Sequence, residues 1–241
     1  MYSKSKVIAT GLIALLFSGC AGMLPWHDAP EATEVNVAFT IENNLLFLTT
    51  TRVENRKGRF FFSTAAAHSA IDPAFAATIG RKRAYSLDLG QKDAIRFRPV
   101  LLDLGGTGDV LLGADAWGNA SISIDYRVGL VTYDKAGIQP EGMEVFSYQA
   151  EPTVMIDVDG TKIPAIVDTG VPDTIILPRS KPGRGTAHVA LAGTDFGTID
   201  VGYANIPRAR VGNRVLSRFL VTIDYGRRMV GLWRDPRIAT R

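Results

Sequence analysis

The feature that most constrains this chain is an internal duplication, in which short motifs recur in the same order. Residues 122–126 read ISIDY, and residues 221–225, which lie 99 positions later, read VTIDY. Each motif is followed by at least one basic residue and then by an apolar run. At the same offset, Leu112-Gly113 falls on Val211-Gly212 without a gap. The two halves of the chain are therefore expected to form similar structures.

A third match lies upstream of these two. Residues 58–73 (GRFFFSTAAAHSAIDP) correspond to residues 163–178 (IPAIVDTGVPDTIILP) at an offset of 105. Each half thus has a strand, a three-residue turn motif, a variable stretch, an apolar-Gly motif and a closing strand. Three matches in the same order are poorly explained by chance, and they predict two equivalent structural halves.

The fold class predicted from local patterns is all-β. Short runs rich in Val, Ile, Phe and Thr alternate with turn residues, and Asp159-Gly160 between two such runs is a hairpin signal. One short helix is predicted over residues 73–79, with Asp72 as its N-cap and Pro73 in its first turn. Phe60, Phe61 and Phe62 cannot all face one side of a strand, so we expect two of them in the core. The runs predicted as strands are Asn44 to Thr51, Arg59 to Ser63, Thr153 to Val158, Ile163 to Val167 and Leu220 to Tyr225.

The N-terminus has the layout of a secretory signal. Lys4 and Lys6 precede an apolar stretch over residues 7–17, which is too short to span a membrane, and small residues lead to Cys20. This layout resembles the lipobox of bacterial lipoproteins, although Phe17 stands where that pattern has Leu. An ordinary secretory signal that happens to contain a cysteine is the alternative.

The resemblance to a lipobox implies that residues 1–19 are removed and that Cys20 carries the lipid. Residues 20–34 have no periodicity and are predicted to be a tether. Ala21 follows the cysteine, where an aspartate would indicate retention in the inner membrane. The expected location is therefore the bacterial envelope, anchored through lipid and facing the periplasm, with the outer membrane favoured over the inner.

The charge balance and the cysteine content limit the kinds of partner, disulfide and metal site that are expected. Lys4 and Lys6 are the only charged residues of the first 19, so the remaining chain has 25 basic and 24 acidic residues. This near balance argues against a nucleic-acid partner. Cys20 is the only cysteine, so no disulfide can form within the chain, and the three histidines lack the spacing of a metal site. We expect a monomer without metal or cofactor.

The turn motifs differ between the halves in one position that matters chemically. The second half reads Ile166-Val167-Asp168-Thr169-Gly170, whereas the first half reads Phe61-Phe62-Ser63-Thr64-Ala65. Gly113 and Gly212 end the apolar-Gly motifs that follow. This order resembles the bacterial retropepsin-like aspartic peptidases, in which Asp-Thr-Gly lies at a turn and an apolar-apolar-Gly motif closes a loop behind it. The resemblance covers roughly residues 35–233.

The resemblance implies a bilobal acid-protease-like fold, with retropepsin-like lobes at 35–140 and 141–241 packed as an intramolecular pseudo-dimer. In that family, two aspartates share a proton and activate a water, and the threonine of each motif bonds to the opposite loop. By this resemblance, Asp168 is the family aspartate, and Ser63 stands where its partner is missing. Thr64, Ala65, Thr169, Gly170, Gly113 and Gly212 are the supporting motif positions.

Two functions follow from this pattern. The first is a catalytically impaired pseudo-peptidase that binds an extended peptide or protein partner in the interlobe cleft, because backbone pairing needs no aspartate pair. The second is an active periplasmic aspartic endopeptidase that uses Asp168, either with an unconventional partner such as Asp173 or by pairing the second halves of two molecules. A purely structural β lipoprotein is a third alternative.

Overall fold

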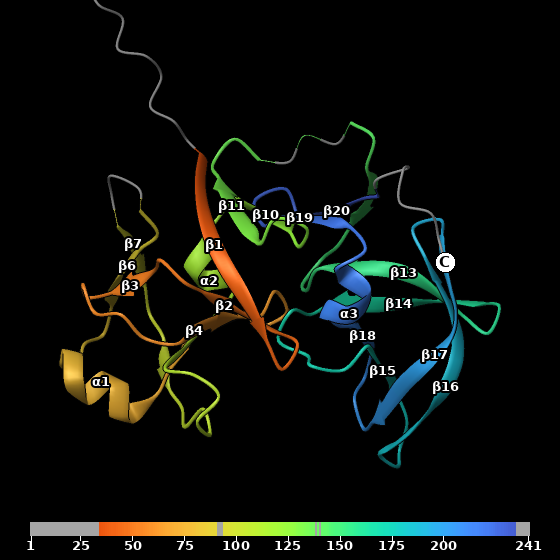
Figure 1. Ribbon diagram of the computed structural model, residues 1–241, viewed down its shortest axis with the longest axis horizontal. Helices are drawn as coiled ribbons and strands as arrows, with labels where there is room; N and C mark the ends of the chain where they lie inside the picture. The colour runs from red at the N-terminus through yellow and green to blue at the C-terminus, as the bar shows by residue number, and fades with distance from the viewer. Residues whose placement is uncertain (1–33, 91–93, 138, 140, 235–241) are drawn as a thin grey trace, which may run out of the picture. The chain divides into compact units, whose positions relative to one another are not determined.

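A computed structural model describes residues 34–90, 94–137, 139 and 141–234, and these residues form mainly strands (Figure 1). The predicted signal segment, Cys20 and all but the last residue of the predicted tether lie outside the described residues. The all-β prediction is confirmed, with three short helices among the described residues. Within the same residues, none of the helices has the length and apolar character needed to cross a bilayer.

The secondary structure comprises twenty strands and three helices in the described residues. They are β1 (Glu34–Glu42), β2 (Leu45–Leu48), β3 (Arg52–Val53), β4 (Phe60–Phe62), β5 (Ala70–Ile71), α1 (Pro73–Ile79), β6 (Tyr85–Asp88), β7 (Ile95–Phe97), β8 (Val100–Leu101), β9 (Val110–Leu112), α2 (Ala114–Trp117), β10 (Ser121–Asp125), β11 (Leu130–Asp134), β12 (Glu144–Ser147), β13 (Thr153–Val158), β14 (Thr161–Val167), β15 (Ile175–Pro178), β16 (Gly183–Leu191), β17 (Thr194–Ala204), β18 (Ala209–Val211), α3 (Asn213–Leu216), β19 (Leu220–Asp224) and β20 (Met229–Trp233).

The strands form three sheets. An 11-stranded sheet has the order β12-β20-β19-β10-β11-β1-β2-β4-β9-β5-β8, a closed barrel has the order β13-β14-β18-β15-β17-β16, and β3, β6 and β7 form a small third sheet. The repeated motifs ISIDY and VTIDY become β10 and β19, which pair antiparallel with Ser123 opposite Thr222. The two halves of the sequence therefore share a continuous sheet.

Strand pairing repeats along the chain as the sequence motifs do. In the first half, β9 pairs parallel with β4 and antiparallel with β5, and β5 pairs parallel with β8. In the second half, β18 pairs parallel with β14 and antiparallel with β15, and β15 pairs parallel with β17. A one-turn helix, α2 or α3, follows β9 or β18 and leads to the shared sheet. The duplicated sequence thus has the same order of pairings in both halves.

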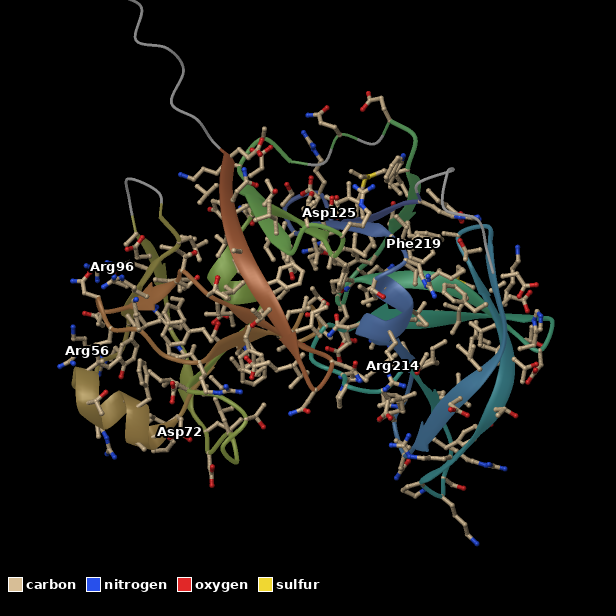
Figure 2. The ribbon with its side chains drawn as sticks, viewed as in Figure 1. Arg56, Asp72, Arg96, Asp125, Arg214 and Phe219 are labelled. Atoms are coloured by element: carbon tan, nitrogen blue, oxygen red, sulfur yellow. The ribbon has the colours of Figure 1, made fainter. Side chains whose placement is uncertain are left out.

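Local sequence signals correspond closely to local structure. Helix α1 begins at Pro73, and the side chain of Asp72 accepts a hydrogen bond from the Ala74 N–H at 2.8 Å, as expected for an N-cap (Figure 2). Asp159 and Gly160 both have positive φ, and they join β13 to β14 as the hairpin signal predicts. Helices α2 and α3 were not predicted, because four residues are too few for a periodic pattern.

The core explains the run of three phenylalanines. Phe60 and Phe62 are buried in the main hydrophobic core, as expected for two residues of the run. Phe61 is buried as well, on the opposite face of β4, where it packs with Leu45 and Phe47. Strand β4 is thus covered on both faces, and Ser63, which follows it directly, is buried as well.

Candidate functional site

The two turn motifs leave their strands in the same way. Ser63 follows β4, and its N–H donates to the Leu112 carbonyl at 3.0 Å. Asp168 follows β14, and its N–H donates to the Val211 carbonyl, also at 3.0 Å. Equivalent backbone bonds therefore fix where each turn begins, directly beside the apolar-Gly motif of its own half.

Gly113 and Gly212 are needed because another stretch of backbone passes over each of them. A Cβ on Gly113 would lie 2.7 Å from the carbonyl oxygen of Ala66, and a Cβ on Gly212 would overlap the carbonyl oxygen of Asp173. Both neighbours are backbone atoms, which cannot rotate away as a side chain could. The apolar-Gly motif thus lets the loop that follows each turn motif pack against the strand.

Thr64 and Thr169 connect the two turns to one another. The Thr64 hydroxyl donates to the Val167 carbonyl at 2.6 Å and accepts from the Thr169 N–H at 3.2 Å. In return, the Thr169 hydroxyl donates to the Phe62 carbonyl at 2.9 Å and accepts from the Thr64 N–H at 3.1 Å. Both threonines are buried, so these four bonds join the two halves at a place from which water is excluded.

Both carboxylate oxygens of Asp168 are occupied by groups of the protein. Oδ1 accepts from the Ser63 hydroxyl at 2.7 Å and from the Gly170 N–H at 2.9 Å. Oδ2 accepts from Nη1 of Arg210 at 2.5 Å. Asp168 is only 2% exposed, whereas 34% of the Arg210 side chain is exposed, so the buried carboxylate is paired with a cation that itself reaches solvent.

Arg210 reaches Asp168 because of the pairing of their strands. It lies in β18, opposite Ile166 of the parallel neighbour β14, and Asp168 is two residues beyond Ile166. The equivalent residue of the first half is Leu111 in β9, which has no charge. An arginine in an otherwise apolar motif was visible in the sequence, but its partner was not.

The geometry of the site does not favour activation of a hydrolytic water by Asp168. A carboxylate acts as a general base only if a water can reach one of its oxygens with suitable geometry. Here the Ser63 hydroxyl donates directly to Oδ1, at a separation of 2.7 Å that leaves no space for a water between the two groups. Ser63 also accepts from the Ala66 N–H at 3.1 Å, so its own hydrogen bonds are satisfied within the loop.

Other sequence-predicted residues lie away from this pair. Asp173, considered as a replacement for the missing carboxylate, forms an ion pair with Arg184 at 3.1 Å. It makes no hydrogen bond to Ser63 or to Asp168 among the described contacts. Ala65 is half-buried in the first loop and supplies no polar side chain.

Asn213 and Asn44 also contribute to the site, and sequence reasoning missed both. The Asn213 side chain donates to the carbonyls of Thr169, at 2.8 Å, and Asn44, at 2.5 Å. The Asn44 side chain in turn donates to the Pro172 carbonyl at 2.8 Å. The turn between β1 and β2 is thereby bonded to the loop that contains Asp168. The only sequence signal was an Asn after Gly212, where the first half has Ala114.

Because of Asn213, the two repeated tyrosines, Tyr126 and Tyr225, differ in the hydrogen bonding of their hydroxyls. Tyr126 donates its hydroxyl to Asn213 Oδ1 at 2.8 Å. Tyr225 is the counterpart of Tyr126, but the counterpart of Asn213 is Ala114, and the buried Tyr225 hydroxyl has no hydrogen-bond partner in the described structure. Burial is the main cause that raises the pKa of Tyr225 well above its ordinary value, and the negative charge of Asp168 contributes.

The comparisons with known proteins leave the family open. No protein-family model matches the chain, and no curated protein matches it. Among the described residues, no group of three or more His, Cys, Asp or Glu side chains is placed to hold a metal ion. We therefore infer function from the geometry of the two loops.

Proposed function

We propose that the chain is a non-catalytic relative of the retropepsin-like aspartic peptidases that binds an extended peptide or protein segment in the bacterial envelope. The observation that carries this proposal is the state of Asp168: one oxygen accepts from Ser63 and Gly170, and the other accepts from Arg210. The site has one carboxylate where the peptidase mechanism uses two that share a proton. The carboxylate that remains is paired with a partly exposed arginine.

Contacts between equivalent residues support the pseudo-dimer part of the proposal. Thr64 bonds to Thr169, which is its own counterpart in the repeat, and Ser63 bonds to Asp168 in the same way. Ser123 and Thr222 are also counterparts, and their hydroxyls lie 2.8 Å apart. An element that touches its own copy is what a two-fold axis produces. The same pairing order in both halves agrees with this symmetry.

The binding part of the proposal follows from what the loops retain. Their reciprocal threonine bonds keep the halves together without the acid pair, so a peptide could still be held between them by backbone hydrogen bonds. The envelope location rests on the N-terminal segment. Replacing Cys20 by Ser should move the protein from the membrane fraction to the soluble periplasmic fraction, and unchanged fractionation would contradict lipid anchoring.

Hydrolysis is tested with a mixed peptide library incubated from acidic to neutral pH and analysed by mass spectrometry. The wild-type protein should release no products. The variant Ser63→Asp/Arg210→Leu restores the second carboxylate and removes the arginine, with leucine chosen because Leu111 occupies the equivalent position. Cleavage by this variant that is abolished by Asp168→Asn would support the peptidase-like scaffold. Cleavage by the wild type that Asp168→Asn abolishes would establish the active endopeptidase instead.

Binding is tested with the same library, made with a photoreactive benzophenone residue in each peptide. Retained peptides should crosslink to residues 63–68 and 168–173, and mass spectrometry of the digested protein locates the crosslinks. In the hydrolysis and stability tests, Arg214→Leu at an exposed position of α3 is the matched control for Arg210→Leu, because both remove one arginine from neighbouring elements. Crosslinks found only elsewhere, or no retained peptide at all, would contradict binding at these loops.

A further inference from the structure

Strand β8 at the end of the 11-stranded sheet carries an unusual run of exposed apolar residues. Val100, Leu101 and Leu102 are 53%, 52% and 51% exposed, and they are consecutive, so both faces of the strand present apolar side chains. Natural proteins usually protect edge strands with charges, prolines or covering loops, because an open edge pairs readily with other chains. A contiguous exposed apolar patch at such an edge indicates an interaction site.

The backbone of Leu101 is directed to the open side. Val100 donates its N–H to the Ser69 carbonyl at 3.0 Å, and Leu102 donates to the Ile71 carbonyl at 3.1 Å, so both point toward β5 and its flanking residue. Alternate residues of a strand direct their backbone groups to opposite edges, and the N–H and C=O of Leu101 therefore face away from β5. No strand of the described structure pairs with this edge.

The second half of the chain shows what fits such an edge. Strand β17 is the counterpart of β8, because it pairs parallel with β15 as β8 pairs parallel with β5. The other edge of β17 pairs antiparallel with β16, with Gly183 opposite Tyr203. In the first half, residues 80–84, which lie directly before β6, form no strand, and β6 pairs with β3 and β7. The place that β16 fills beside β17 is therefore open beside β8.

The stretch of sequence that leads into this edge is strongly basic. Residues 52–98 contain 10 Lys and Arg residues against 4 Asp and Glu residues, whereas the rest of the chain after residue 19 contains 15 against 20. Arg98 lies two positions before Val100, and Arg56 and Arg96, labelled in Figure 2, belong to the same basic segment. Among the described residues of this segment, the exposed cations are Arg52, Arg56, Lys57, Arg59, Arg81, Lys82, Arg83, Arg96 and Arg98.

We propose that β8 is a docking edge for an extended acidic segment of a partner protein, which adds antiparallel at Leu101. Backbone bonds to Leu101 would supply the pairing, Val100 and Leu102 would contact apolar side chains of the segment, and the basic residues would attract its carboxylates. The proposed contacts use neither Ser63 nor Asp168, although β8 pairs with β5, which follows the Ser63 loop. Because the edge is short, the interaction is transient. Because it depends on attraction between opposite charges, its affinity falls as the salt concentration rises.

The probe is a fluorescein-labelled peptide, Glu-Glu-Val-Thr-Val-Glu-Glu, measured by fluorescence anisotropy with the full chain. It should bind the wild-type protein. Leu101→Pro removes the outward N–H and should weaken binding about tenfold. A peptide in which the central threonine is N-methylated removes a backbone donor from the ligand side, and it should lose a similar factor even if Leu101→Pro fails to fold. Val128→Thr, at another exposed apolar position, should bind as the wild type does.

Charge and occupancy are tested in the same assay. A probe with lysines in place of the glutamates should bind at least about tenfold more weakly, because it meets like charge. Equal binding of the two probes, equal binding by Leu101→Pro and the wild type, or no binding of the acidic probe would each overturn the proposal. Binding to phosphatidylglycerol vesicles that Val100→Thr/Leu102→Thr abolishes would assign the edge to a membrane instead. Self-association lost in Leu101→Pro would assign it to a second copy.

Discussion

Thr64 and Thr169 hydrogen-bond to each other in both directions: each hydroxyl accepts from the other's backbone N–H, at 3.1 and 3.2 Å. Each hydroxyl also donates to the strand that precedes the opposite loop, at Val167 or Phe62. Since all of these groups are buried, the loss of one hydroxyl leaves a donor and an acceptor without water to replace it. This arrangement connects two segments separated by 105 residues.

Thr64→Val should lower the free energy of unfolding by about 3 kcal/mol. Valine keeps the shape of the side chain but leaves the Val167 carbonyl and the Thr169 N–H unpaired in the interior, at about 1–3 kcal/mol for each. Urea unfolding measures the change. Thr40→Val, at an exposed position of β1, is the matched control and should change stability by less than about 0.5 kcal/mol.

The two threonines should also be energetically coupled. The double variant Thr64→Val/Thr169→Val should lose less stability than the sum of the single losses, because the four bonds join the same two loops and breaking one pair weakens the pair that remains. Strictly additive losses would show that each hydroxyl holds the two loops independently, and they would contradict the coupling.

Arg210→Leu should destabilise the protein by about 2 kcal/mol. It leaves the buried Asp168 carboxylate without its cation, although the partial exposure of Arg210 screens the interaction and reduces the cost. In the Arg210→Leu background, Asp168→Asn should recover part of that loss, because it removes the unpaired charge. Arg214→Leu is the control. Further loss on adding Asp168→Asn, as large as in the wild-type background, would exclude the ion pair as the cause.

The repeated tyrosines should respond differently to the same substitution. Tyr126→Phe leaves Asn213 Oδ1 without its donor and should cost about 1–2 kcal/mol. Tyr225→Phe removes a buried hydroxyl that has no partner in the described structure, so it should be neutral or slightly stabilising. Urea unfolding of the two variants gives the comparison, and equal losses would show that the Tyr225 hydroxyl is satisfied by bound water.

Stability should fall at alkaline pH, in part through Tyr148. Burial, and secondarily the negative charge of Asp224, raises the pKa of Tyr148 to about 12, from an ordinary value of about 10. Because the folded-state pKa is above the unfolded one, this contribution is fully present below about pH 10 and is lost as the pH rises through about 12. Tyr148→Phe should make the fall in unfolding free energy between these values shallower. An unchanged slope would contradict the raised pKa.

Gly170→Ala should be destabilising by about 1–3 kcal/mol, because the added Cβ would lie 2.7 Å from the Cβ of Ser63. The clash involves the two Cβ atoms, so Ser63→Gly should relieve it, whereas Ser63→Ala should not. Gly183→Ala, where no atom lies within 4 Å of the added Cβ, is the control and should be close to neutral. Equal effects of Gly170→Ala and Gly183→Ala would contradict the close approach of the two loops.

Features that depend on neighbours along the chain could be predicted from the amino-acid sequence. Asp72 before Pro73 predicted the start of α1, and Asp159-Gly160 predicted a hairpin, because caps and tight turns depend on a few adjacent residues. The repeated motifs predicted two halves with equivalent pairings, and the all-β class followed from the short alternating runs. These signals also pointed to Ser63 and Asp168 as counterparts.

The surroundings of Asp168 depend on how distant segments of the chain pack together. Arg210 lies 42 residues away and reaches the carboxylate because β18 pairs parallel with β14, and Asn213 reaches Asn44 across 169 residues. A charge in an apolar motif and an asparagine after a glycine have no unique partner in the sequence, since hydrogen bonds and ion pairs depend on positions within a few ångströms. The packing of the two halves brings Ser63, Arg210 and Asp168 together, and it thereby sets what this carboxylate can do.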